Sequence, residues 1–119
     1  MSLTATAVRV LPEPVRTLGF AAISGSYAAI GTPFNYPIHY FMIQNLSDAA
    51  AMISWNGTDD HFPLEVNGYI IMDVSSNRTS TGGSFMISQG TQFYAKALTA
   101  SLPTTGNIYL SVFYGFVNA

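Results

Sequence analysis

The segment Ile108-Tyr109-Leu110-Ser111-Val112-Phe113-Tyr114-Gly115-Phe116 is apolar at nearly every position. Because successive side chains of a β-strand point to opposite faces of a sheet, its alternate positions form two sets. One set is a complete core face: Ile108, Leu110, Val112, Tyr114 and Phe116. The other set is also largely apolar: Tyr109, Ser111, Phe113 and Gly115. An outward sheet face is usually polar, so the segment predicts a strand whose outer face another surface covers.

Short apolar segments of this kind recur from about residue 25 onward, separated by turns rich in Gly, Pro, Asn and Ser. The predicted strands are 26–30, 37–44, 49–55, 61–66, 69–74, 84–88, 91–97 and 108–116, with a further strand within 4–20. Asn56-Gly57 and Asn67-Gly68 are the best candidates for tight hairpin turns. No long stretch has helical periodicity with caps. The pattern predicts an all-β fold, a single-domain antiparallel β-sandwich of jelly-roll type.

A second predicted strand has two apolar faces. In residues 37–44, Ile38, Tyr40 and Met42 oppose His39, Phe41 and Ile43. We predict that His39 and Phe41, together with Tyr109 and Phe113, lie at an interface between subunits. The alternative is that these are central strands covered by long loops of the same chain.

Charged residues are scarce, at 8% of the 119 residues, and Lys96 is the only one in residues 81–119. Ordinary soluble domains have about 25%. Charges keep a monomer soluble and discourage its sheet edges from pairing with other chains. The composition therefore favours a subunit of a permanent assembly. The basic residues are scattered and the net charge is -2, so we expect no nucleic acid partner.

The N-terminal segment differs from the rest of the chain. It contains Arg9, Glu13 and Arg16, and Pro12 and Pro14 favour an extended conformation. We predict an extended arm over residues 1–17, whose charges pair with a neighbouring chain, and a β-sandwich domain over residues 18–119. The alternative is a frayed terminus.

No motif of a known catalytic centre is present, so the protein is not expected to be an enzyme or to hold a cofactor. Asp59-Asp60-His61 is the best candidate for metal ligands, but adjacent side chains point in different directions and a solvated turn is the preferred interpretation. Trp55, Tyr94, Tyr109 and Tyr114 are candidates for stacking on sugars, with packing as the preferred role. The sequence shows neither an export signal nor an uninterrupted apolar stretch for a membrane helix.

Three phrases resemble small structural proteins of tailed-bacteriophage virions: IQNLSDAAAMISWNGTDDH (43–61), SQGTQFYAKA (88–97) and PTTGNIYLSVFYG (103–115). The resemblance covers about residues 41–115. It implies a capsid decoration, or cement, protein: a small β-sandwich, often a homotrimer, made in the host cytoplasm, that binds the major capsid protein on the outside of the head and stabilises it. The alternatives are a tail, head-fibre or receptor-binding β-module of the virion, or a carbohydrate-binding jelly roll.

Overall fold

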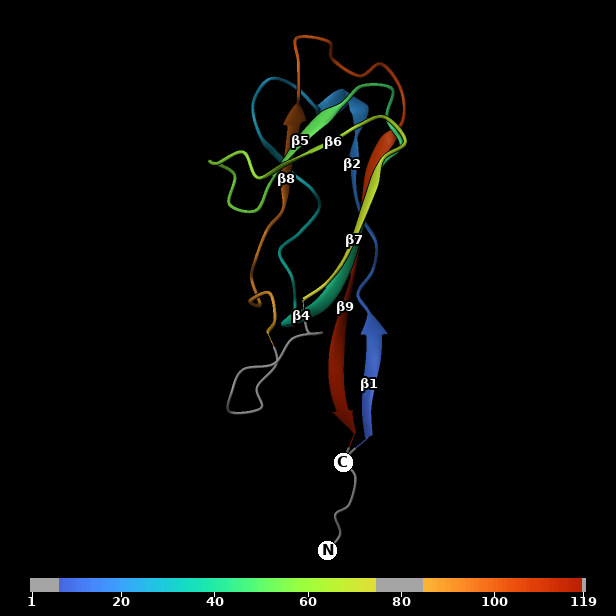
Figure 1. Cartoon of the computed structure of the whole chain (residues 1–119), viewed down its shortest axis with the longest axis vertical. Helices are drawn as coiled ribbons and strands as arrows, with labels where there is room; N and C mark the ends of the chain where they lie inside the picture. The colour runs from blue at the N-terminus through green and yellow to red at the C-terminus, as the bar shows by residue number, and fades with distance from the viewer. Residues whose placement is uncertain (1–6, 75–84, 119) are drawn as a thin grey trace, which may run out of the picture.

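The computed structural model describes residues 7–74 and 85–118 as two antiparallel sheets packed face to face (Figure 1). Sheet A contains β1 (Ala7–Pro12), β2 (Arg16–Gly19), β4 (Ile38–Asn45), β7 (Tyr69–Asp73) and β9 (Asn107–Asn118). Sheet B contains β3 (Ala28–Ala29), β5 (Ala51–Ser54), β6 (Phe62–Leu64) and β8 (Tyr94–Ala97). A short 3-10 turn, η1 (Phe20–Ala22), follows β2. The predicted all-β sandwich is confirmed.

The strand order follows from the long central strand β9. On one side β9 pairs with β4, and on the other it pairs with β2 and then with β1 along its length. From β2 onward the orders are β2-β9-β4-β7 in sheet A and β3-β8-β5-β6 in sheet B. From β2 to β9, successive strands alternate between the sheets apart from the β5–β6 hairpin, which is the order of a jelly roll.

The core lies between the inner faces of the two sheets. Ile108, Leu110 and Val112 of β9 are fully buried, as their alternation predicts. They share the core with Phe41 of the neighbouring strand β4 and with Phe93, which directly precedes β8 of sheet B; these two rings contact edge to face at 5.1 Å between ring centroids. The predicted core face of β9 is therefore confirmed over residues 108–112.

A buried asparagine fastens the two sheets together. Asn45, at the end of β4, donates from Nδ2 to the carbonyl oxygens of Ala49 (2.9 Å) and Leu64 (3.0 Å), and Leu64 belongs to sheet B. Its Oδ1 accepts hydrogen bonds from the backbone and the hydroxyl of Ser47. All of its side-chain groups are thereby satisfied, which a buried amide requires.

The expected tight hairpin at Asn67-Gly68 is wrong. Asn67 has the expected positive φ of 62°, but the turn carries the chain from β6 in sheet B to β7 in sheet A. The Asn67 N–H donates to the Asn45 carbonyl and the Asn45 N–H donates to the Gly68 carbonyl. A left-handed turn residue thus serves a connection between sheets here. By contrast, the segment around Asn56-Gly57 does join the paired strands β5 and β6.

The N-terminal segment is part of sheet A. The predicted boundary at residue 17 falls inside β2, which pairs with β9, and Leu18 is in the core. Before it, β1 and the C-terminal part of β9 form a two-stranded ribbon that extends beyond the sandwich (Figure 1). The molecule is accordingly elongated, with principal extents of 60 × 26 × 22 Å. Residues 1–6 of the predicted arm lie outside the described residues.

Of the predicted strand 84–88, the described residues 85–88 contribute one isolated bridge, between Ile87 and Ile38. In the described part of the chain, no helix has the length and apolar character needed to span a membrane.

Candidate interaction surface

The outer face of sheet A, which faces away from sheet B, carries a patch of mainly apolar side chains. The antiparallel register sets three rows across β7, β4 and β9: Tyr69-Gln44-Tyr109, Ile71-Met42-Ser111 and Asp73-Tyr40-Phe113. We call these nine residues the outer patch. The intervening positions, among them Phe41, Ile43 and Val112, are the buried ones.

Two members of the outer patch are unusually open for apolar side chains. Tyr69 is 64% exposed and Ile71 is 63% exposed, and both lie on the edge strand β7. Tyr40 and Phe113 are half-buried because their rings stack on one another, with centroids 4.9 Å apart. The outer patch contains no lysine or arginine, and Asp73 is its one charged member. A contiguous apolar surface with so little charge is typical of an interaction site.

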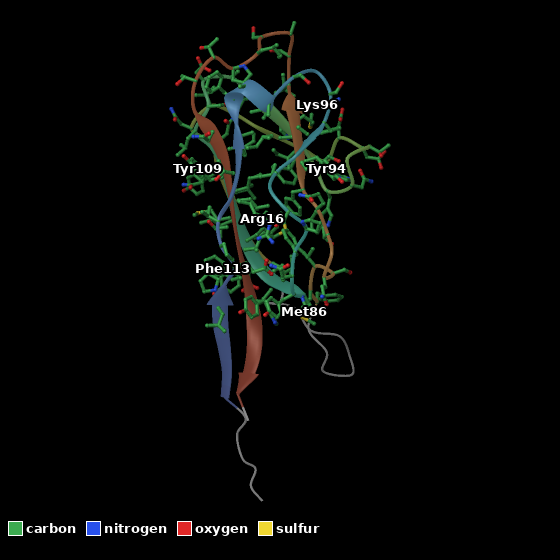
Figure 2. The ribbon with its side chains drawn as sticks, turned by 180° about the vertical axis from the view of Figure 1, so that it is seen from behind. Arg16, Met86, Tyr94, Lys96, Tyr109 and Phe113 are labelled. Carbon is green, nitrogen blue, oxygen red and sulfur yellow. The ribbon has the colours of Figure 1, made fainter. Side chains whose placement is uncertain are left out.

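The structure places Tyr109 and Phe113 on this outer face, where strand alternation predicts them (Figure 2). Tyr109 is fixed by a hydrogen bond from Asn107 Nδ2 to its hydroxyl, at 3.0 Å. Their contact with another subunit stays a prediction.

The assignment of Phe41 to the interface is wrong. A β-bulge between Ile38 and Tyr40 inserts one extra residue into β4, so Ile38, Phe41 and Ile43 all reach the core and Phe41 is fully buried. A bulge reverses the alternation that follows it. His39, at the bulge, is half-buried. A Cβ added to Gly115 would lie 2.6 Å from His39 Nε2, so the imidazole occupies the space beside this glycine.

The expectation that Glu13 and Arg16 offer charges to a neighbour is also wrong. Each is only 5% exposed, and Arg16 Nη2 lies 2.6 Å from Glu13 Oε1. Arg16 also donates to the carbonyl oxygens of Thr32 (2.6 Å) and Pro33 (2.9 Å). Glu13 accepts the backbone N–H groups of Asn35 and Tyr36. The pair therefore clamps the β1–β2 connection onto the loop before β4. Arg9 lies in β1, and its side chain is outside the described part.

Beside this clamp is a hollow of about 290 Å³, lined in part by Pro14, Arg16, Gly31 and Asn35. The Arg16 guanidinium is already engaged by Glu13 and by backbone carbonyl oxygens, so it is not offered to a bound anion.

The opposite side of the sandwich carries a polar cluster (Figure 2). Lys96 Nζ lies 3.3 Å from Asp60 Oδ1 and 4.7 Å from the centre of the Tyr27 ring, and the Tyr27 hydroxyl donates to Asp60. Partial burial, followed by the bond to Asp60, raises the pKa of Tyr27 above its ordinary value. The Tyr27 hydroxyl and then Lys96 lower the pKa of Asp60. These groups satisfy one another on the surface, where such pairs contribute little to stability.

The candidate metal ligands Asp59, Asp60 and His61 point to different partners. Asp59 accepts a hydrogen bond from Asn56 Nδ2 at 2.9 Å, and His61 Nδ1 accepts the Trp55 N–H at 2.8 Å. Asp60 pairs with Lys96. Residues 7–74 and 85–118 contain no group of three or more metal-ligating side chains.

The four candidate sugar-stacking residues do not form one platform. Trp55 packs against Phe93, with centroids 5.1 Å apart, and Tyr114 stacks on Tyr36 at 3.9 Å. Tyr94 belongs to sheet B and Tyr109 to sheet A, on opposite sides of the sandwich (Figure 2).

Sequence reasoning missed Tyr40 and Met42 as members of the outer patch, because no feature of residues 37–44 marks the bulge. It also missed the Glu13–Arg16 pair. The available signal was opposite charges three residues apart in a segment held extended by Pro12 and Pro14.

Comparison of the sequence with protein-family models and curated proteins, and of the structure with solved structures, gave no match.

Proposed function

We propose that this protein is a non-enzymatic structural subunit of a phage virion, which binds the outside of the capsid as a homotrimer and stabilises it. The observation that carries the proposal is the outer patch. A jelly roll has its core between its sheets, so the outer face of a free monomer is expected to be polar. Here that face exposes Tyr69 and Ile71 by more than half.

A covered outer face is what a permanent assembly provides. Interfaces of obligate oligomers resemble a divided core and are depleted in charge. The outer patch has this composition, with stacked Tyr40 and Phe113 rings on its half-buried side. Four of the nine patch residues lie in the segments that resemble phage structural proteins. Segment 43–61 contains Gln44, and segment 103–115 contains Tyr109, Ser111 and Phe113.

The alternatives within the virion, a tail, head-fibre or receptor-binding module, use the same kind of surface. A carbohydrate-binding module has less support, because its four candidate aromatic residues are divided between the core and the two sides of the sandwich.

The deciding experiment is a quantitative mass-spectrometric inventory of purified particles, with heads and tails separated. The proposal expects this protein in the head fraction, at a copy number that is a multiple of three and in fixed ratio to the major capsid protein. Particles lacking it should release their genome at a lower temperature than complete particles. Its presence in tails alone favours the tail module, and its absence from all particles overturns the proposal.

A further inference from the structure

The ribbon of β1 and the end of β9 has two unpaired edges. Among residues 7–74 and 85–118, β1 pairs with β9 alone, and β9 beyond Tyr114 pairs with β1 alone. The ribbon therefore leaves the sandwich as two strands without further neighbours (Figure 1). Two-stranded ribbons are marginally stable in water, and three or more strands are usually needed.

The direction of the free backbone groups follows from Pro12. Pro12 has no N–H, and the Glu13 N–H donates to the Val112 carbonyl oxygen, so Pro12 and Phe113 are a non-hydrogen-bonded pair. Hydrogen-bonded and non-hydrogen-bonded pairs alternate along an antiparallel ladder. Val8 and Val10 consequently direct their N–H and C=O groups away from β9, and Gly115 and Val117 direct theirs away from β1.

Within the described residues, both edges carry little of the usual protection against pairing. Native edge strands are guarded by charges, prolines, bulges or covering loops. Ala7–Pro12 has one charged residue, Arg9, and its one proline stands at the end nearest the sandwich. Residues 115–118 have neither a charge nor a proline.

We infer that three copies of this chain close their ribbons into one barrel, with the β1 edge of each copy paired to the β9 edge of the next. The inference rests on the proposed function in that it requires the copies to associate. Each copy supplies the two strands β1 and β9, so three copies supply six. Contacts between two different surfaces of one chain produce a ring when the rotation closes.

A second copy fits these edges because of strand direction. Within one ribbon β1 and β9 are antiparallel. When copies are arranged around an axis along the ribbon, every β1 runs one way and every β9 the other. Each junction between a β1 edge and a neighbour's β9 edge is then also antiparallel, and the outward groups of Val8 and Val10 face those of Gly115 and Val117. No edge stays open.

The ribbon is also continuous with the outer patch. Val10 pairs with Gly115, and Pro12 pairs with Phe113, which belongs to the outer patch. Val10 is about half exposed, at 49%. By alternation Val10 and Gly115 extend the outer face of sheet A along the ribbon, so one association of copies can cover both surfaces.

The test uses proline to remove single outward N–H groups from the full-length chain. Val10→Pro acts on the β1 edge and Val117→Pro on the β9 edge, and neither N–H belongs to the ladder within the subunit. The matched controls are Val10→Thr and Val117→Thr, which keep the N–H group. Light scattering coupled to size exclusion gives the mass, circular dichroism reports the fold, and amide hydrogen exchange reads individual N–H groups.

The expected result is a trimer for the wild type and both threonine variants, and loss of the trimer in both proline variants with the β-type spectrum retained. A mixture of the two proline variants should form a dimer, because each retains the edge that the other has lost. In the wild type, the N–H groups of Val8, Val10, Gly115 and Val117 should exchange as slowly as that of Leu11, which faces β9.

Three results would overturn the inference. A monomeric wild type excludes it directly. Loss of association in Val10→Pro alone indicates pairing of two β1 edges around a twofold axis. Wild-type mass in both proline variants shows that the outer patch alone holds the copies together. In that case the proposed function stands. Conversely, absence of the protein from particles would overturn the proposed function but would not affect the inference that the ribbons pair.

Discussion

Arg16 Nη2 donates to Glu13 Oε1 across 2.6 Å, and both side chains are buried inside one subunit. This pair fixes the chain where it passes from the ribbon into the sandwich, since Arg16 is the first residue of β2 and Glu13 directly follows β1.

Glu13→Gln is expected to lower the free energy of unfolding by about 3 kcal/mol, because it leaves a buried guanidinium without its counter-charge. Urea unfolding followed by fluorescence measures the change. Glu65→Gln is the matched control at an exposed position and is expected to change stability by less than about 0.5 kcal/mol. Equal effects of the two substitutions would contradict an important role for the pair.

Ile71→Lys is expected to weaken self-association by about a hundredfold, which corresponds to about 2.8 kcal/mol. The reason is that an ammonium group on the β7 side of the outer patch would lose its hydration when a second copy covers the patch. Sedimentation or light scattering over a concentration series measures it. Leu102→Lys, at an exposed site in the loop before β9, is the control and should leave association unchanged. Unchanged association in Ile71→Lys would remove the outer patch from the interface.

Asp48 is expected to make stability depend on acid pH. Its carboxylate accepts the Thr104 hydroxyl and N–H and the Thr105 N–H, and these bonds lower the pKa of Asp48 below 3.8. A carboxylate whose pKa is lower in the folded state stabilises the fold above its unfolded pKa, and this contribution is lost as pH falls through the folded value.

The check on Asp48 is a series of urea midpoints from about pH 6 down to pH 2, compared with Asp48→Asn. The variant should be less stable at neutral pH and should lose less stability below about pH 4. Glu65→Gln is the control because it leaves Asp48 in place. It should show the same difference between the urea midpoints at neutral and acid pH as the wild type. If the urea midpoint of Asp48→Asn falls as steeply with decreasing pH as that of the wild type, Asp48 does not have this role.

Two glycines with similar backbone angles should respond differently to alanine. Gly90 has φ 87° with open space around it, so Gly90→Ala should cost about 1 kcal/mol from backbone strain alone. Gly106 has φ 90°, and an added Cβ would lie 2.1 Å from the Leu46 carbonyl oxygen. Gly106→Ala should therefore cost roughly 3 kcal/mol or more in thermal or urea unfolding. Similar losses at the two sites would show that the loop beside Leu46 yields easily.

How far the fold could be predicted depended on regular alternation. Residues 108–112 of β9 keep an uninterrupted period of two, so their core and outer faces were assigned correctly. In β4 one inserted residue at the bulge moved Phe41 into the core and Tyr40 to the outer face. Without homologous sequences or a turn residue to mark it, a bulge leaves no local signal.

Pairings between distant segments were also beyond prediction. Glu13 and Arg16 are charged, and charged residues are almost never fully buried unless they are paired. What buries them is the loop at residues 32–36, which supplies carbonyl and N–H groups from another part of the chain. The positive φ expected in the Asn67-Gly68 turn occurs at Asn67 but not at Gly68, and the sheet that each flanking strand joins is decided by the whole core.

The central position of β9 has a consequence for folding during synthesis. Ala7 pairs with Asn118, and Arg16 pairs with Leu110. The first strands to be synthesised therefore pair with residues that are synthesised roughly a hundred positions later. Apart from the β4–β7 pair, sheet A cannot form its ladders until Asn107–Asn118 has left the ribosome, and closing such distant contacts is slow. Until then β1 and β2 lack the strand with which they pair, a state in which neighbouring nascent chains can associate with one another.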